Sequence, residues 1–211
     1  GVLNAHGGDL PRYRGNACQA WAIINGEKEI GLCIHKMIGG ELDSGDIIAK
    51  DYLLIDDKIN ITQVYKQIEV LTPRMLLQSI NLLAENSNYI LEVQSKRNED
   101  VLRCYPRRPE DGKIDWNTYA DQIHKLIRVS CEPYSGAYTY LNDEKVIIWK
   151  SELVKIEEEW LGVSGQFAEF DEYGFLNVLT GNGKLKLIEI EFNKKRGTPG
   201  VFFNSIRNRF S

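Results

Sequence analysis

The sequence predicts an α/β domain followed by a smaller domain built from β-strands. Apolar runs of strand length alternate with segments of helical period in the first half of the chain. From Ser135 onward the apolar period becomes two, and turn residues separate five short runs. The polar stretch at residues 86–100 between these halves has the composition of a linker.

The composition is that of an ordinary globular protein. The 211 residues are 43% hydrophobic and 27% charged, which allows one large domain or two small ones with a real core. No apolar run approaches the length of a membrane span, and the first residues do not resemble a signal peptide. We therefore expect no membrane association and a cytoplasmic location.

The four cysteines, Cys18, Cys33, Cys104 and Cys131, are widely spaced and form no Cys-x-x-Cys pair. This spacing favours buried reduced thiols over a disulfide framework or a structural zinc site. We expect no metal site.

The charge is unevenly distributed. A net charge of −4 argues against a generic nucleic-acid binder, yet residues 184–211 carry seven basic residues against two acidic ones. These basic residues could bind RNA phosphates, form a solvated surface, or make a contact between the subunits of a possible homodimer. The last two interpretations together are favoured.

The first elements are a short strand at residues 2–4 and a loop rich in glycine and proline. We expect this loop at the carboxyl end of a parallel strand, where α/β sheets bind ligands. Asn16 is expected to cap a helix that runs to Asn25. Its predicted apolar stripe consists of Ala17, Ala20, Trp21 and Ile24.

Residues 29–37 and 47–54 predict strands, and His35 alternates along the first, so we expect a structural imidazole there. Residues 61–86 predict helix. The Thr72-Pro73 pair within it predicts a kink or two abutting helices, with Thr72 as a cap. The side chains expected to be buried are Val64, Ile68, Leu71, Met75, Leu76, Ile80 and Leu83.

Residues 119–129 predict a helix with His124 on its wetter side. The five strands expected after it form a small open barrel; they span residues 137–140, 145–149, 165–170, 175–179 and 185–190. Tyr138, Tyr140 and Trp149 suit either a stacking surface for nucleic acid or the core, and their alternating spacing favours the core.

The chemistry is concentrated between Asn4 and Asp43. Asn4 and His6 are two residues apart, so on an extended backbone their side chains leave the same face. An amide donor beside an imidazole suits a reaction that needs both an oxyanion partner and a proton acceptor. Asp43 comes from a separate turn and can orient the imidazole.

The pattern Asn-x-His-x-x-x-Leu-Pro-x-Tyr-Arg-Gly at residues 4–15, followed by Asp43-Ser-Gly45, resembles the formyltransferases that use 10-formyltetrahydrofolate. Residues 107–116, Arg-Arg-Pro-Glu-Asp-Gly-Lys-Ile-Asp-Trp, resemble the segment that closes the catalytic domain of that family. The resemblance implies that residues 1–116 are the C-terminal part of a Rossmann-like catalytic domain. Residues 117–211 would then form an OB-like C-terminal domain.

The resemblance also implies roles for particular residues. Asn4, His6 and Asp43 would be the catalytic triad. The loop Gly40, Glu41, Leu42 and Asp43 would lie beside the folate cofactor, N10-formyltetrahydrofolate. The substrate cleft would be shaped by Leu10, Pro11, Arg12, Tyr13, Arg14 and Gly15.

Two departures from the family pattern stand out. Asp9 places an acid in the substrate loop, and the chain begins at the Asn-x-His motif, so we expect an N-terminally truncated catalytic domain. The favoured acceptor is a nucleotide-linked 4-amino sugar, as in lipopolysaccharide biosynthesis. Methionyl-tRNA, hydrolysis of formyltetrahydrofolate, and an inactive fragment or binding module remain alternatives.

Overall fold

The computed structural model describes residues 1–155 and 158–211. The chain divides into two compact units, Gly1–Arg107 (unit 1) and Arg108–Ser211 (unit 2). This division lies nine residues before the boundary that we expected after Trp116. The difference arises because Ile114 and Trp116 are buried in the core of unit 2. No helix among the described residues is long and apolar enough to cross a membrane.

Unit 1 is a mixed α/β structure around a three-stranded sheet. The strands are β1 (Leu3–His6), β3 (Glu29–Lys36) and β4 (Ile47–Leu54), in the order β1-β3-β4. Both pairings are antiparallel, which corrects our expectation of a parallel strand before the loop. Parallel pairing in unit 1 is limited to the short strands β2 (Arg14–Gly15) and β5 (Arg103–Cys104).

Helix α1 (Cys18–Asn25) follows the loop but begins differently from our prediction. Its N-cap residue is Ala17, with φ 54°, and no side chain caps the helix, so the predicted Asn16 cap is wrong. The predicted apolar stripe is wrong as well, apart from Ala20. The residues of this helix that are buried are instead Cys18, Ala20, Ala22 and Ile23.

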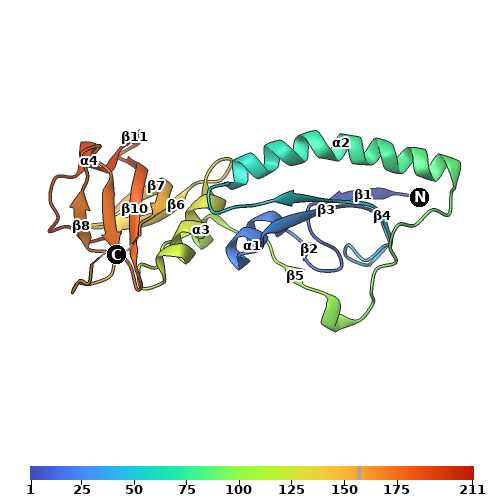
Figure 1. Cartoon of the computed structure of the whole chain (residues 1–211), viewed down its shortest axis with the longest axis horizontal. Helices are drawn as coiled ribbons and strands as arrows, with labels where there is room; N and C mark the ends of the chain where they lie inside the picture. Colours follow the sequence, from blue (N-terminus) through green and yellow to red (C-terminus); the bar gives the residue numbers. More distant parts are fainter. Residues whose placement is uncertain (156–157) are drawn as a thin grey trace. The chain divides into compact units, whose positions relative to one another are not determined.

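Helix α2 (Ile61–Glu85) is a single helix with Pro73 inside it, so neither two abutting helices nor a Thr72 cap is found. Its start is strong because Asn60 and Gln63 form a reciprocal capping box. In Figure 1 the helix runs along the β1-β3-β4 sheet, where Met75 joins Leu32 and Ile34 in a buried cluster. The predicted burial of Ile80 is wrong, since 55% of that residue is exposed.

Residues 86–104 do not behave as a free linker. Leu91 and Glu92 hydrogen-bond to Ile47 at the start of β4, and a 3-10 helix, η1 (Asn98–Asp100), leads to β5. Gln94 is only 2% exposed. This segment therefore belongs to unit 1 and is packed onto it.

Unit 2 is rich in β-structure. After η2 (Pro109–Gly112) and α3 (Ala120–Ser130), the sheet order is β6-β7-β10-β9-β8, with β11 also paired to β10. The strands are β6 (Ala137–Leu141), β7 (Glu144–Leu153), β8 (Phe167–Phe170), β9 (Leu176–Leu179), β10 (Lys184–Phe192) and β11 (Lys195–Gly197). A short helix, α4 (Pro199–Phe202), follows.

The core of unit 2 lies between α3 and this sheet and includes Trp116 stacked on Phe210 at 5.4 Å. His124 is buried and lies 2.9 Å from Ser151 Oγ, so its predicted place on the wetter side is wrong. Tyr138, Tyr140 and Trp149 are half-buried and absent from that core. Alternating burial explains this, because the buried positions are Ala137, Thr139 and Leu141 in β6 and Val146 and Ile148 in β7.

Candidate active site

The pairing of β1 with β3 assembles the candidate site. Asn4 lies directly opposite His35, and His6 lies opposite Cys33. Asn4 and His6 reach the same carboxylate: Asn4 Nδ2 donates to Asp43 Oδ1 at 3.4 Å, and His6 Nδ1 lies 3.6 Å from Asp43 Oδ2. The structure thus brings together the three residues that the sequence singled out.

His35 is a fourth member of this cluster. It is 1% exposed, as a structural imidazole would be, yet its Nε2 lies 3.2 Å from Asn4 Nδ2 and 3.6 Å from Asp43 Oδ1. Its Nδ1 lies 3.0 Å from the Lys36 carbonyl oxygen. A carbonyl only accepts, so Nδ1 must carry the hydrogen, and Nε2 then accepts from the Asn4 amide. His35 therefore fixes which way the Asn4 amide points.

His6 is held in a complementary way. Its Nε2 lies 2.7 Å from the Tyr13 carbonyl oxygen and donates to it, which leaves the Nδ1 lone pair facing Asp43. Burial is the largest influence on this ring and lowers the pKa of His6 below 6.5, against the opposing effects of the Tyr13 carbonyl and Asp43. A neutral His6 with Nδ1 unprotonated is a proton acceptor.

Asp43 sits in a constrained turn. Its φ is 45°, in the left-handed region, and its Oδ2 accepts the backbone N–H of Gly15 at 2.9 Å. Burial disfavours its charge, but the rings of His35 and His6 and the Gly15 N–H outweigh that effect and lower the pKa of Asp43 to about 2. The carboxylate is ionised at neutral pH.

The loop before α1 passes close beneath the His6 ring. Gly8 is required there, because a Cβ at this position would lie 2.5 Å from His6 Nε2 and 2.3 Å from the Tyr13 carbonyl oxygen. Leu10 is fully buried, and Tyr13 is 5% exposed with its hydroxyl donating to Glu27. Burial, followed by this bond, raises the pKa of Tyr13 to about 12.

The predicted substrate residues therefore fall into two groups. Leu10 and Tyr13 are buried and support the loop, whereas Arg12 is exposed. Pro11, Arg14 and Gly15 are half-buried. Arg14 is held by Gln94, whose Oε1 accepts a hydrogen bond from Arg14 Nη2 at 2.8 Å.

Asp9, the acid in the predicted substrate loop, has a partner. Lys50 Nζ lies 3.0 Å from Asp9 Oδ1, donates to the Leu10 carbonyl oxygen at 2.9 Å, and lies 3.4 Å from Glu92 Oε2. The Tyr52 hydroxyl also donates to Asp9, at 3.1 Å. Asp9 is thus an anchor that ties the loop to β4.

The predicted folate loop is exposed. Gly40, Glu41 and Leu42 lie at the surface, with Leu42 45% and the neighbouring Met37 56% exposed. Glu41 accepts a hydrogen bond from Ser44 Oγ at 2.5 Å. The loop offers exposed apolar side chains and open backbone next to Asp43. No group of three or more His, Cys, Asp or Glu among the described residues is placed to hold a metal ion.

Gln94 is the residue that the sequence analysis missed. Its Nε2 donates to the carbonyl oxygens of Asp43, at 2.9 Å, and Gly45, at 2.5 Å. The stretch around it is polar and aperiodic, which is why it looked like a linker. A single glutamine in such a stretch carries no local signal of burial.

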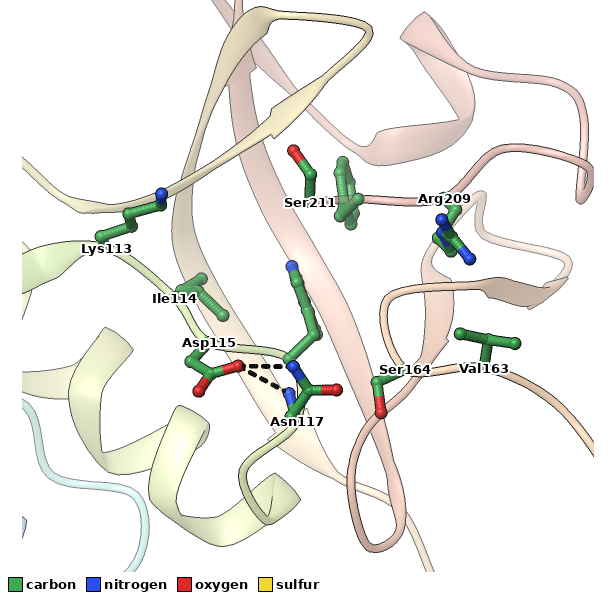
Figure 2. A pocket seen from close by; sticks show the side chains of 10 residues that line it. Lys113, Ile114, Asp115, Asn117, Val163, Ser164, Arg209 and Ser211 are labelled. Carbon is green, nitrogen blue, oxygen red and sulfur yellow. Dashed lines mark hydrogen bonds between the residues drawn. The ribbon is translucent and has the colours of Figure 1, made fainter.

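Unit 2 has an open pocket of about 530 Å³. Figure 2 shows Lys113, Asp115, Asn117, Val163, Ser164 and Arg209 around it, over the buried Ile114. Asp115 Oδ1 accepts from both the backbone N–H and the side-chain amide of Asn117, at 3.0 Å each. None of the triad residues lines this pocket.

Residues 1–80 match the family model described as formyl transferase, and residues 107–207 match the model of the formyl transferase C-terminal domain. The bifunctional polymyxin resistance protein ArnA of Wigglesworthia glossinidia brevipalpis is 36% identical over 154 residues. That match covers 72% of this chain and 23% of ArnA. The chain thus spans about a quarter of the length of this curated relative.

Two solved structures share the fold. HypX from Aquifex aeolicus, solved in complex with tetrahydrofolic acid, has a TM-score of 0.69 at 17% identity, over 97% of this chain and 35% of that chain. An N-formyltransferase from Helicobacter canadensis, solved with folinic acid and dTDP-3-aminofucose, has a TM-score of 0.63 at 23% identity. It is matched over 88% of this chain and 65% of its own length.

Proposed function

This chain belongs to the formyltransferase family, and on that premise we propose that it transfers a formyl group from N10-formyltetrahydrofolate to a primary amine. The observation that carries the proposal is the Asn4–His6–Asp43 cluster, in which an amide donor and a neutral imidazole converge on one carboxylate. The folate supplies the activated formyl group. The chain's own residues supply a hydrogen-bond donor, a proton acceptor and a counter-charge.

Asn4 is proposed to stabilise the negative charge that develops on the formyl oxygen. One of its amide hydrogens is held by His35 Nε2 at 3.2 Å, and the other makes a longer contact of 3.4 Å with Asp43. The longer contact is the one that a formyl oxygen would replace. A preorganised donor of this kind contributes roughly 3 kcal/mol to a transition state.

His6 is proposed to take the proton from the attacking amine at Nδ1 and to return it to N10 of the departing tetrahydrofolate. The amine nitrogen first bonds to the formyl carbon, and the bond from that carbon to N10 breaks when the oxyanion collapses. The proton lost by the amine is the one gained by N10, so the step balances. Once protonated, the ring has an acceptor at each nitrogen, the Tyr13 carbonyl and the Asp43 carboxylate. The ionised Asp43 thereby stabilises the imidazolium.

The loop containing Gly40, Glu41, Leu42 and Asp43 is proposed to receive the folate. A flat heteroaromatic ring needs apolar contact and backbone hydrogen-bonding groups, and this loop exposes both. A Cβ at Gly40 would meet nothing within 4 Å, so the approach to the backbone is open.

The acceptor is proposed to be a nucleotide-linked amino sugar, with a 4-amino sugar as the first candidate. The Helicobacter canadensis relative was solved with dTDP-3-aminofucose, which supports this substrate class. Residues 10–15 are proposed to shape its cleft. Within that segment Arg12 is exposed and Arg14 is half-buried. Leu10 and Tyr13 are buried and support the segment from inside the protein.

Methionyl-tRNA is the second candidate, supported by the basic end of the chain. Several of those cations already have acidic partners within unit 2: Lys184 pairs with Glu158, Lys186 with Asp171, and Arg196 with Glu132. This pairing leaves less positive charge for RNA and favours the sugar. We also propose that the sheet of unit 2 corresponds to an OB-like open barrel.

The test is formyl transfer from 10-formyltetrahydrofolate by the purified chain. dTDP-, UDP- and GDP-linked 4-amino and 3-amino sugars and methionyl-tRNA are offered in parallel. Turnover of one sugar that is lost in both Asn4→Ala and His6→Ala supports the proposal. Release of formate without an acceptor indicates hydrolysis instead, and binding of folate without any turnover indicates a non-catalytic binding module.

A further inference from the structure

We propose that Gln94 is a positioning residue for the candidate active site: its buried side-chain amide holds the Asp43 turn so that the Asp43 carboxylate faces Asn4 and His6. The inference rests on the proposed function for its kinetic consequence. The statement that Gln94 holds the Asp43 turn depends only on the hydrogen bonds of Gln94.

The Gln94 amide uses both its nitrogen and its oxygen to bind residues of the candidate site and its turn. Nε2 has two hydrogens, and they go to the carbonyl oxygens of Asp43 and Gly45. Oε1 accepts from Arg14 Nη2 at 2.8 Å. One side chain, 2% exposed, therefore joins the turn after β3 to the strand β2. Because both polar atoms of the Gln94 amide are paired, its hydrogen bonds rigidify the elements that they join.

The Asp43 turn needs such support. Asp43 has a positive φ, a conformation that costs a non-glycine residue free energy and persists only when its surroundings hold it. Gly45 is tightly packed, since a Cβ there would lie 1.8 Å from the Lys36 carbonyl oxygen. The exposed residues on the other side of the turn, Glu41 and Leu42, give it little cover. The bonds from Gln94 hold the turn from inside the protein.

The connection continues to the reacting groups through β2. Gly15, next to Arg14, donates its backbone N–H to Asp43 Oδ2 at 2.9 Å, the same oxygen that faces His6 Nδ1 at 3.6 Å. Gln94 thus fixes Asp43 twice, at its backbone through the carbonyl and at its carboxylate through Arg14 and Gly15. A shift of about 1 Å at such a carboxylate is enough to lower a rate substantially.

The test uses Gln94→Met, which keeps the length of the side chain but removes its hydrogen bonds, and Gln94→Glu, which keeps the acceptor for Arg14 but removes both donors. The readouts are the imidazole titration of His6 by NMR and the pH profile of kcat. The titratable groups facing His6 are Asp43, His35 and Cys18. Of these three groups only Asp43 is hydrogen-bonded to Gln94, so its effect is separable.

We expect Gln94→Met to titrate His6 at lower pH than the unsubstituted chain, because the attraction of Asp43 is weakened, and to lower kcat about tenfold or more. Gln94→Glu adds a carboxylate whose own charge opposes that shift, so for this variant the readout is the loss of kcat alone. In an Asp43→Asn background, Gln94→Met is expected to change neither quantity further. Gln63→Met is the matched control. It breaks the α2 capping box, lowers stability, and leaves the His6 titration unchanged.

An unchanged His6 titration in Gln94→Met, an unchanged kcat in Gln94→Glu, or an equal loss of kcat with and without Asp43, would overturn the inference. If Gln94→Met does not fold, Gln94→Glu and the same double-variant comparison decide. Absence of formyl transfer by the unsubstituted chain would sink the proposed function alone, because the NMR titration does not depend on turnover.

Discussion

Asn4 and His35 face each other across strands β1 and β3, and the Asn4 amide donates to His35 Nε2 over 3.2 Å. The Nδ1–H of His35 is used by the Lys36 carbonyl, so the ring accepts from Asn4 in one orientation only. The contact fixes the amide of Asn4 with its nitrogen toward the site. Several measurable consequences arise from this and the neighbouring contacts.

Replacing Asn4 by Ala removes the proposed donor to the formyl oxygen. We expect kcat to fall by about 10²–10³, with a small change in KM, because the donor acts mainly on the charge that develops during reaction. Steady-state kinetics with the preferred amine measure this. Asn88→Ala, at an exposed site on the same unit, is the control. A loss confined to KM would show that Asn4 binds substrate instead.

Replacing His35 by Phe removes the acceptor for Asn4 while keeping a buried ring. The amide of Asn4 is then free to rotate, and we expect kcat to fall about tenfold with His6 still in place. The fold should survive, because the Phe side chain has a similar volume. Kinetics combined with thermal unfolding separate the two effects. Equal kcat values for His35→Phe and the unsubstituted chain would contradict the orienting role.

The acid limb of the kcat/KM profile should lie below pH 6.5. Burial lowers the pKa of His6, so the ring stays neutral and able to accept a proton at pH values where an ordinary imidazole is charged. In Asp43→Asn the attraction of the carboxylate for the imidazolium is lost. In this variant the acid limb of the kcat/KM profile should therefore move to still lower pH, and kcat/KM itself should fall. A limb above pH 6.5 would contradict this assignment.

Stability should fall in acid through Asp43. Its pKa is about 2 in the folded chain against 3.8 ordinarily, so the unfolded chain binds more protons as the pH falls from 4 to 2. The contribution is present above pH 4 and lost through this window. It is at most roughly 2 kcal/mol, reduced by whatever solvent reaches the carboxylate. Urea unfolding of Asp43→Asn should show a flatter pH dependence.

Replacing Lys50 by Met releases the Asp9 anchor of the substrate loop. We expect KM for the amine to rise several-fold and kcat to change little, because the triad does not contact Lys50. The loss of a half-buried cation from Asp9 and the Leu10 carbonyl should also cost roughly 1–3 kcal/mol of stability. Lys66→Met, on the exposed face of α2, is the control. A change in kcat alone would argue against a loop anchor.

Replacing Pro73 by Ala should stabilise unit 1 without affecting activity. Pro73 is exposed inside α2 and cannot donate a backbone hydrogen bond to the preceding turn. Restoring that bond in a helix that already accommodates the ring is expected to raise the free energy of unfolding by about 1–3 kcal/mol. Urea unfolding with formyl-transfer kinetics measures both. A destabilised variant would show that α2 depends on the proline for its curvature.

The sequence by itself determined the features that depend on local period and spacing. Strand β4 begins and ends where its apolar run does, and Asn4 and His6 share a face because strand side chains alternate. The resemblance to formyltransferases is carried by contiguous motifs and agrees with the family models matched at both ends of the chain. The helical period at residues 61–86 also predicted helix α2, although it did not show that the helix continues through Pro73.

Tertiary structure decided which distant residues join the site. His35 enters the cluster because the register of β1 against β3 sets it opposite Asn4, 31 positions earlier. Gln94 reaches Asp43 across 51 positions, and its burial depends on packing that no local pattern records. Strand register and the burial of single polar side chains are set by the whole core. Periodicity describes one element at a time, so these contacts appear only when the elements are assembled.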